Sequence, residues 1–407
     1  MKRIKSKKIM KKSISTLLLL AALSSSAVVF TTSCSSDDPT TEIPSVDVDR
    51  NNLKGQIRSG ENLVLESGTY KLTGKLEIES GGKLTIKPGV IVEATKFVDG
   101  EEIRYIAVAQ GGQIFVEGTK EAPVVMTAAD KVQQAWGGVV ICGRAPINPG
   151  ATASAEVSGL TYGGTVANDN SGSIKYLRIE YSGYAYSSTK EFNGLSMFGV
   201  GNGTTIEYVQ VHEGSDDGFE WFGGTVNTKY LVATANEDDQ FDWTEGWNGT
   251  NEFWYAKEAA SKGNRGIEAD NNSNNHLANP ISNPTIKNMT LIGRGNVGSE
   301  RQAIKLRVGT KGTFDNLVLS NWGVGFDVEH NEGIGYVADG TLKATNVKFE
   351  NVLLKSVGIM SVPAGSPQGT IGASADVSRI FTENANATGA GAGTATPEWA
   401  KGWTVGL

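Results

Sequence analysis

Two short stretches of the chain place acidic and aromatic side chains at the same relative positions. The first begins at Asp216 and reads DDGFEWF, and the second begins at Asp238, 22 residues later, and reads DDQFDWT. Carboxylates gathered in this way suit a hard cation such as Ca²⁺, which takes several oxygen ligands. Grouped carboxylates also act as acid and base when a sugar chain is hydrolysed.

A third stretch, GIEA, extends the acidic pattern at Glu268, and the pairs Ile304-Lys305 and Phe326-Asp327 continue it. If the stretches lie on one another, Asp216 lies on Asp238 and Glu220 lies on Asp242. The candidate ligand or cation site therefore comprises Asp216, Asp217, Glu220, Asp238, Asp239, Asp242 and Glu268. Within it, the predicted metal ligands are Asp216, Asp217, Asp238 and Asp239, and the predicted cation is Ca²⁺.

Stacked like charges repel, so something must offset them, and three interpretations remain open. The carboxylates bind a cation, or they pair structurally with backbone N–H groups and basic residues, or they form a face that binds carbohydrate. The third interpretation adds an aromatic platform made of Trp221, Trp243 and Trp247. The basic residues available for pairing, which are also weak candidates for a catalytic base, are Arg265, Arg301 and Lys305.

Internal repeats indicate the elements that position these residues. GGKLTI at Gly81 recurs as GGQIFV at Gly111, and IKYLRI at Ile174 recurs as IEYVQV at Ile206. Further copies of the second motif start at Thr228, Ile286, Phe314 and Ala344. The motif places apolar residues at its first, fourth and sixth positions, and its last three residues alternate as in a strand.

A period of 20 to 35 residues made of short strands indicates coils stacked on one another, because one coil cannot bury its inward side chains alone. We therefore predict an all-β fold, a right-handed parallel β-helix over residues 51–372. A β-sandwich is the alternative, but it needs more two-residue hairpin turns than the chain offers. Residues 373–407 are predicted to form a C-terminal cap or lid, with Trp399 and Trp403 folded over the last coil.

The N-terminus has the order of an export signal: seven basic residues, an apolar stretch over 17–29, and small residues before Cys34. The apolar stretch is too short to span a bilayer. The segment resembles a bacterial lipoprotein signal, although Thr31 stands where that signal usually has Leu. The resemblance implies cleavage after residue 33 and acylation of Cys34, which anchors the protein to outer-membrane lipid at the cell surface. Residues 34–50 then connect the lipid to the folded part as a flexible tether.

The net charge of the chain limits the classes of molecule that it can bind. The whole chain has 37 basic and 44 acidic residues, and all seven basic residues of the leader are lost on cleavage, so the mature chain carries a net charge near −14. Nucleic acid needs a positive field and is excluded as a partner, while cations and neutral ligands such as sugars fit better. We expect Cys142, in an apolar run, to be a buried small hydrophobic residue.

Several units together resemble a family of surface lipoproteins with a right-handed β-helix, found in Gram-negative bacteria of gut and marine habitats. These units are GGKLTIKPG at Gly81, WGGVVI at Trp136, YGG at Tyr162 and DDGFEWFGG at Asp216. The resemblance covers about residues 60–360 and implies the fold and the location, but no catalytic residues. We therefore expect a surface binding module for carbohydrate or another nutrient, with an outer-membrane transporter as a possible partner. A polysaccharide lyase or glycoside hydrolase, or a structural adhesive protein, is the alternative.

Overall fold

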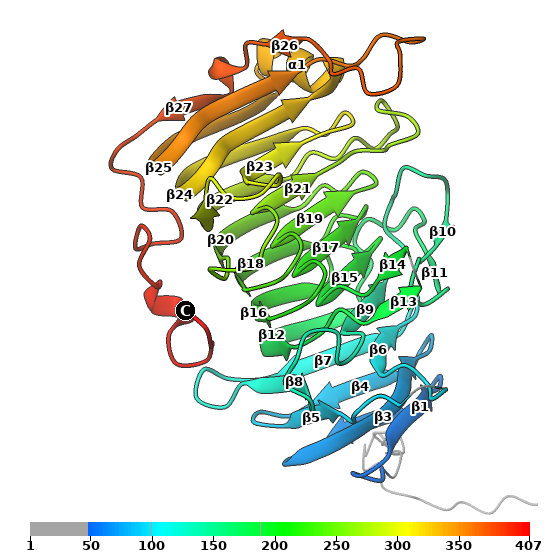
Figure 1. Cartoon of the computed structure of the whole chain (residues 1–407). Coiled ribbons are helices and arrows are strands. Elements are labelled where there is room, and N and C mark those ends of the chain that lie inside the picture. The colour runs from blue at the N-terminus through cyan, green and yellow to red at the C-terminus, as the bar shows by residue number, and fades with distance from the viewer. Residues whose placement is uncertain (1–47, 99, 188) are drawn as a thin grey trace, which may run out of the picture. The chain divides into compact units, whose positions relative to one another are not determined.

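The protein is described by a computed structural model that covers residues 48–98, 100–187 and 189–407. The predicted signal peptide (1–33), Cys34 and most of the predicted tether lie outside the described residues. Within them, the strands lie above one another in chain order from β1 to β25 (Figure 1). No helix in this part of the chain is both long enough and apolar enough to cross a membrane.

Three parallel sheets form the walls of the solenoid. Sheet 1 contains β2 (Asn62–Leu65), β4 (Lys83–Ile86), β7 (Gln113–Glu117) and the first parts of β12 (Gly172–Glu180), β16 (Thr205–His212), β18 (Asn227–Thr234), β20 (Thr250–Lys257), β22 (Thr285–Gly295), β24 (Gly312–Glu329) and β25 (Leu342–Ile359). Sheet 2 contains the first part of β3 (Thr69–Ile78), β5 (Ile91–Ala94) and β8 (Val124–Ala128). It also contains the parts of β12, β16, β18, β20, β22, β24 and β25 that follow a corner.

Sheet 3 carries the acidic stretches. It contains β1 (Leu53–Ile57), the end of β3, β6 (Tyr105–Val108), β9 (Val139–Cys142), β15 (Leu195–Phe198), β17 (Phe219–Phe222), β19 (Phe241–Thr244), β21 (Ile267–Ala269), β23 (Gln302–Leu306) and the ends of β24 and β25. Its strands pair in parallel from coil to coil, each hydrogen-bonded to the matching strand of the next coil. The one antiparallel pairing in the described part of this sheet is that of β26 with the end of β25, beyond the last coil. The prediction of a right-handed parallel β-helix is therefore confirmed, and the β-sandwich is excluded.

The repeats stack in the predicted register. Leu84 pairs with Ile114, and Ile174 pairs with Ile206, which in turn pairs with Thr228. One further copy escaped the sequence analysis because Asn251 occupies its first, inward-facing position. Asn251 is fully buried, and its side-chain oxygen accepts hydrogen bonds from the backbone N–H and the hydroxyl of Thr228 at 3.0 and 2.8 Å.

A single residue in the left-handed conformation makes the corner between sheets 1 and 2. The corner residues of successive coils have φ between 50° and 60°; they are Tyr176, Tyr208, Tyr230, Phe253, Asn288, Asn316 and Asn346. This corner explains the spacing of the repeat, because the turn lies between the inward residues at its first and fourth positions. The aromatic corner residues stack along the solenoid, with ring centroids 4.3 Å apart between Tyr176 and Tyr208.

The interior is a continuous apolar core that includes large aromatic residues. Trp221, Trp243 and Trp247 are fully buried in it, and the Trp221 ring stacks on Trp247 and Trp254 with centroids 4.5 and 5.1 Å apart. The predicted aromatic platform is therefore wrong, because these rings face the inside of the solenoid and cannot contact a ligand. Phe219 is also inward-facing, so the alternation of a strand places Glu220 on the outside. Cys142 is buried as expected.

The described C-terminal part differs from the expected lid. Helix α1 (His330–Asp339), the 3₁₀ helix η1 (Ser378–Ile380) and strands β26 (Ser374–Ala375) and β27 (Phe381–Glu383) pack on β25. The chain beyond β27, with the 3₁₀ helix η2 (Glu398–Ala400), then runs back along sheet 2 (Figure 1). Trp403 contacts Tyr176 and Tyr208, so it covers earlier coils rather than the last one.

We predict that Trp221→Ala lowers the free energy of unfolding by about 3–5 kcal/mol, because it leaves a cavity inside the aromatic core. Leu277→Ala, at a side chain that is 57% exposed, is the control and should change it by less than about 0.5 kcal/mol. Denaturant unfolding monitored by circular dichroism measures both. A Trp221→Ala protein as stable as the control would contradict the burial of this ring.

Candidate functional site

The outer face of sheet 3 carries a column of acidic side chains at matching positions. Glu220 pairs with Asp242, Asp242 with Glu268, and Glu268 with Lys305, which pairs with Asp327. This register confirms the alignment of the acidic stretches that the sequence predicted. Neighbouring strands lie about 4.8 Å apart, so three consecutive carboxylates project from positions directly above one another.

Sheet 1 of the same solenoid arranges its outer charges in the opposite way. Its equivalent column alternates in sign from coil to coil, through Lys175, Glu207, Lys229, Glu252, Lys287 and Asp315. Ion pairs join Lys175 to Glu207 at 3.3 Å and Lys229 to Glu252 at 3.0 Å. Alternation satisfies the fold without repulsion. The run of like charges on sheet 3 is therefore not a requirement of the stacking.

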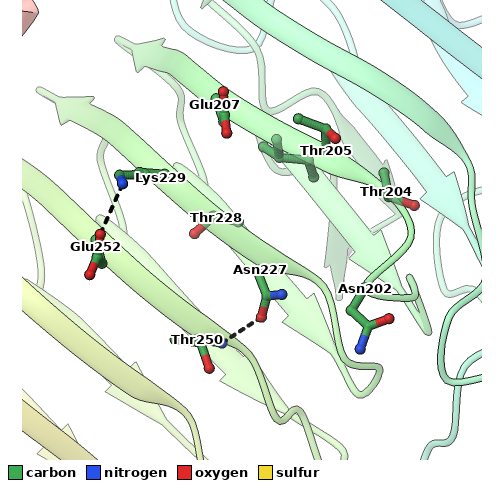
Figure 2. Close-up of a pocket in the computed structure, with 10 residues that line it drawn as sticks. Asn202, Thr204, Thr205, Glu207, Asn227, Thr228, Lys229, Thr250 and Glu252 are labelled. Carbon is green, nitrogen blue, oxygen red and sulfur yellow. Dashed lines mark hydrogen bonds and ion pairs between the residues drawn. The ribbon is translucent and has the colours of Figure 1, made fainter.

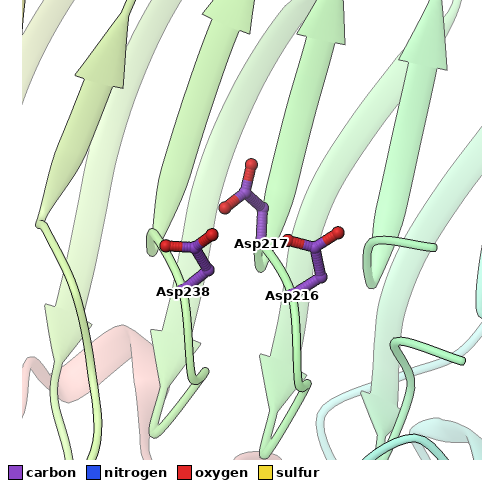
Figure 3. Close-up of side chains that lie close together, drawn as sticks. All are labelled: Asp216, Asp217 and Asp238. Carbon is purple, nitrogen blue, oxygen red and sulfur yellow. The ribbon is translucent and has the colours of Figure 1, made fainter. Parts of the chain in front are cut away.

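The turns that lead into β17 and β19 add four more carboxylates. Asp217 accepts a hydrogen bond from the backbone N–H of Asp239 at 2.9 Å, which ties the two turns together. Gly218 allows this close approach, since a Cβ at that position would lie 2.5 Å from the side chain of Asn236. The carboxylates of Asp216, Asp217 and Asp238 gather around a common space (Figure 3).

Three overlapping groups of carboxylates result, and in each the oxygen atoms lie within 4.8 Å of one another. The groups are Asp216–Asp217–Asp238 (group A), Asp217–Glu220–Asp242 (group B) and Asp239–Asp242–Glu268 (group C). Asp217 belongs to groups A and B, and Asp242 belongs to groups B and C. The seven residues of the predicted site are thus brought together in one cluster.

Basic residues reach only one end of the cluster. The Arg265 guanidinium contacts Asp239 at 3.3 Å and Glu268 at 2.5 Å, and Arg307 pairs with Glu268 and with Asp270. Lys305 pairs with Glu329 at 3.1 Å.

At the other end, no described basic side chain forms an ion pair with a carboxylate of groups A and B; the ion pairs of the cluster involve Asp239 and Glu268 of group C. Glu220 and Asp238 accept hydrogen bonds from the neutral side chains of Asn193 and Asn264. Arg301, the remaining basic candidate, lies in the turn before β23 and forms no ion pair with the described residues. The uncompensated negative charge is therefore concentrated in groups A and B.

Burial and mutual repulsion shift the proton affinities of these groups. Burial, and then the charge of Asp238, raises the pKa of Asp216 to about 7. Burial also raises the pKa values of Asp217, Glu220 and Asp242 well above their usual range, and neighbouring carboxylates add to the effect. The cluster cannot hold all its negative charges unless protons or a cation neutralise part of them.

Three oxygen atoms of the cluster are buried and accept no hydrogen bond from the described residues. They are the Oδ1 atoms of Asp239 and Asp242 and the Oε1 atom of Glu268, and only the last of these lies in an ion-pair contact, with Arg265. Asp239 is only 3% exposed, so solvent does not reach its carboxylate. A buried acceptor without a donor is costly, and such atoms in native proteins mark an unseen proton, water or ion.

Three further acids border the cluster that sequence reasoning did not find. Glu156 and Glu191 lie in the segment between β9 and β15, and their charges raise the pKa values of Glu220 and Asp216. Glu245 accepts a hydrogen bond from the Tyr162 hydroxyl at 2.6 Å. Glu156 and Glu191 belong to no repeat, so no spacing could have placed them. They come close because the loops before and after β12, in which Glu156 and Glu191 lie, pack on sheet 3 around a second apolar cluster.

Those two loops form one wall of the site, and each contains a short hairpin. The loop before β12 contains β10 (Ala153–Ser154) paired with β11 (Thr161–Tyr162), and the loop after β12 contains β13 (Ala185–Ser187) paired with β14 (Lys190–Glu191). Val157 and Tyr162 pack on Phe198 and Phe222, which project outward from β15 and β17. The N-terminal side of sheet 3 is covered in this way, and the acidic column begins where the cover ends.

A separate hollow lies on sheet 1, away from the acidic cluster (Figure 2). Hydroxyl and amide groups line it, together with the ion pair between Lys229 and Glu252. The backbone N–H of Thr250 donates to the side chain of Asn227 at 2.7 Å. The charges of this ion pair are thus satisfied within the protein.

We predict that Asp242→Asn stabilises the protein in the presence of a chelator by about 1 kcal/mol, because it removes a like charge from between Glu220 and Glu268. Glu252→Gln is the matched control on sheet 1. It removes an exposed ion pair and should leave stability unchanged or lower it by less than about 1 kcal/mol. Melting temperatures in EDTA test both, and a destabilised Asp242→Asn protein would show that the column is already neutralised.

Comparison with known families gives one match. A family model described as a pectate-lyase-like beta helix domain matches residues 55–404. The matched segment includes all three sheets and every residue of the acidic cluster. No curated protein and no solved structure matches the chain significantly.

Proposed function

Because the chain belongs to the family of pectate-lyase-like β-helix domains, we propose that it is a glycan-binding module whose sheet-3 carboxylates hold a divalent cation of the Ca²⁺ type. The observation that carries the proposal is the contrast between the two charge columns. Sheet 1 neutralises its charges within the protein, whereas groups A and B on sheet 3 leave theirs for a ligand.

The donor set favours Ca²⁺ among cations. All candidate ligands are carboxylate oxygens, which suit hard cations, and the cluster contains no histidine or cysteine of the kind that zinc selects. Ca²⁺ accepts six to eight oxygen ligands in flexible geometry, so carboxylates on a turn and on a strand both qualify. Asp239 and Asp242 supply buried oxygens that lack a donor, as expected of a site that an ion completes.

A cation also explains how a negatively charged protein would take up a sugar chain. Without it, the acidic face repels acidic polysaccharides and offers neutral ones only hydrogen-bond acceptors. A bound Ca²⁺ reverses the local charge and keeps coordination positions for sugar hydroxyl or carboxylate oxygens. Recognition then comes from oxygen ligands on the ion, since the tryptophans of the chain that were expected to stack on sugars are buried.

We further propose the location that the N-terminal leader predicts. Acylation of Cys34 would fix the protein to outer-membrane lipid, and the following residues would hold the solenoid at the cell surface. A glycan captured there would be passed to an outer-membrane transporter. Support for this part of the proposal comes from the order of residues in the leader.

The second candidate function is a polysaccharide lyase or glycoside hydrolase of the β-helix type. It is favoured by the basic residues beside the carboxylates and by carboxyls whose raised pKa suits a general acid. Against a lyase, both terminal nitrogens of Arg265 are held in ion pairs, with Asp239, Glu268 and Glu300. A structural or adhesive role is the third candidate, and it needs no small ligand.

We predict that Ca²⁺ raises the melting temperature of the purified protein and that EDTA reverses the rise. Asp217→Asn should abolish the effect, because this carboxylate is shared by groups A and B. Glu207→Gln, in the alternating column of sheet 1, is the matched control and should keep the full response. A melting temperature that does not respond to Ca²⁺ in the unaltered protein would refute the cation site.

We predict that the protein retains one or more members of a glycan array in Ca²⁺ and releases them in EDTA. The same incubations should yield no new reducing ends and no unsaturated sugars. Either product would instead establish hydrolase or lyase activity. Absence of both retention and products, in a protein that responds to Ca²⁺, would favour the structural role.

A further inference from the structure

We propose that His276, His330 and Glu332 form a pH-sensitive latch, which holds the first turn of helix α1 against the solenoid while His330 is neutral and releases it when His330 gains a proton. The three residues come from separate parts of the chain. His276 lies in the loop between β21 and β22, whereas His330 and Glu332 lie in the first turn of α1. None of them belongs to the acidic cluster, so this inference does not depend on the proposed function.

The contacts of the latch join three segments of the chain. His276 Nδ1 lies 3.0 Å from a carboxylate oxygen of Glu332, and the ring centroids of His276 and His330 are 4.7 Å apart with planes inclined by 72°. The backbone N–H of Val308, in the turn between β23 and β24, donates to His330 Nδ1 at 3.2 Å. The backbone also packs closely here, since a Cβ on Gly309 would lie 1.9 Å from the carbonyl oxygen of His276. Loop, turn and helix therefore meet at the two imidazole rings.

The hydrogen bond from Val308 requires a neutral His330 ring. A ring nitrogen that accepts an N–H bond carries no hydrogen, so the neutral ring has its hydrogen on Nε2. Protonation places a second hydrogen on Nδ1 and turns this acceptor into a donor. The Val308 N–H would then face another N–H, and the bond that connects the helix to the turn is lost.

Two further effects oppose a positive charge on His330. Its ring belongs to the first residue of α1, where the helix dipole disfavours cations. It also contacts the ring of His276, so two protonated imidazoles would repel each other. Burial, and then the charge of His276, hold the pKa of His330 below its ordinary value. The closed latch therefore favours the neutral ring.

The backbone is strained at both ends of the hydrogen bond between Val308 and His330. Val308 has a φ of 37° and His330 a φ of 73°, in the left-handed region that side chains rarely adopt. This conformation is especially unfavourable for a β-branched residue such as Val308. Strained residues persist only where the surrounding contacts enforce them. Loss of the hydrogen bond lets both residues relax, which favours release of the first turn of α1.

Nearby acids favour a protonated ring, but basic residues reduce their effect. The charges of Asp270 and Glu329 raise the proton affinity of His330. Asp270 pairs with Arg307 at 2.9 Å, and Glu329 pairs with Lys305 at 3.1 Å. Burial and His276 outweigh these acids, since the pKa of His330 is lowered overall.

The other elements that pack on α1 direct their charges elsewhere. On β25, the residue beside the start of the helix is the uncharged Ile359. On η1, the charge of Arg379 acts on Asp376. Lys311, at the end of the turn that contains Val308, lies 4.4 Å from the ring centroid of Tyr336, farther along the helix. The charges that act on the latch therefore come from the loop, the turn and the first turn of α1.

The direction of the pKa shifts sets the pH range of the latch. Because the pKa of His330 is lowered, its contribution to stability is present above the ordinary value of 6.5 and is lost as the pH falls below it. Burial favours protonation of Glu332, but the hydrogen bond from His276 lowers the pKa of this carboxyl overall. Its contribution is therefore present above 4.5 and lost below. His276 Nδ1–H donates to Glu332 in either charge state of the ring. The His330 contact should thus open first, between pH 6.5 and 4.5.

Hydrogen exchange of the purified protein tests the latch. Exchange is measured by mass spectrometry at pH 7.5 and at pH 5.5 and corrected for the intrinsic effect of pH. Protection of Val308 and of the first turn of α1 should fall by at least about tenfold at pH 5.5, while β17 and β19 keep theirs. His330→Asn should abolish the pH response, because Asn Oδ1 accepts the Val308 N–H, tolerates a positive φ and does not titrate. His212→Gln, on sheet 2, is the matched control and should keep the full response.

Two results would overturn the latch. One is equal protection of the first turn of α1 at both pH values in the unaltered protein. The other is a His330→Asn protein that still loses this protection at pH 5.5, because another group would then sense the pH. If His330→Asn does not fold, an NMR titration of the His330 ring in the unaltered protein decides. A midpoint below 6.5 that coincides with the loss of protection supports the latch, and a midpoint at or above 6.5 contradicts it.

Discussion

Hydrogen bonding between equivalent strands of successive coils is the interaction on which this structure depends. It holds each residue above its counterpart at a fixed spacing of about 4.8 Å, so each side chain contacts the side chain at the equivalent position of the next coil. Inside the solenoid, this register places Phe219 on Phe241 and Trp221 on Trp243, and the core becomes a continuous stack of rings. Outside, the same register brings charged side chains close whether their signs agree or not.

The two charge columns show how differently one backbone can be used. On sheet 1 the signs alternate, and each charge is offset by its neighbour on the next coil. On sheet 3 the acidic residues follow one another from Glu220 to Glu268, and their repulsion is offset by arginine only at the far end. A solenoid therefore tolerates local repulsion between like charges, because the backbone hydrogen bonds and the apolar core stabilise the coils that carry them.

The surroundings of the acidic column strengthen the repulsion between its carboxylates. The loops on either side of β12 cover the first part of sheet 3 with apolar side chains and add Glu156 and Glu191 at the border. Burial weakens the screening by water, so each carboxylate interacts more strongly with its neighbours and with any cation that enters. The same burial raises the pKa values of Asp217, Glu220 and Asp242.

Much of this arrangement was determined by the sequence alone. Repeats with a period of 20 to 35 residues define which positions stack, so the parallel solenoid, its register and the column from Glu220 to Asp327 could be predicted from local patterns. The coil containing Asn251 was missed because a polar residue, satisfied by Thr228, occupies an inward position.

Tertiary structure decided the rest. The direction of Trp221 and Trp243 depends on which face of the strand is inside, and a period of two cannot tell inside from outside when both faces carry aromatic or acidic residues. The path of the C-terminal segment along sheet 2, the approach of Glu156 to Glu220 and the pairing of Arg265 with Asp239 each bring a residue outside the repeats against a repeated one. Such contacts depend on how loops pack on the finished solenoid, and no local spacing encodes that packing.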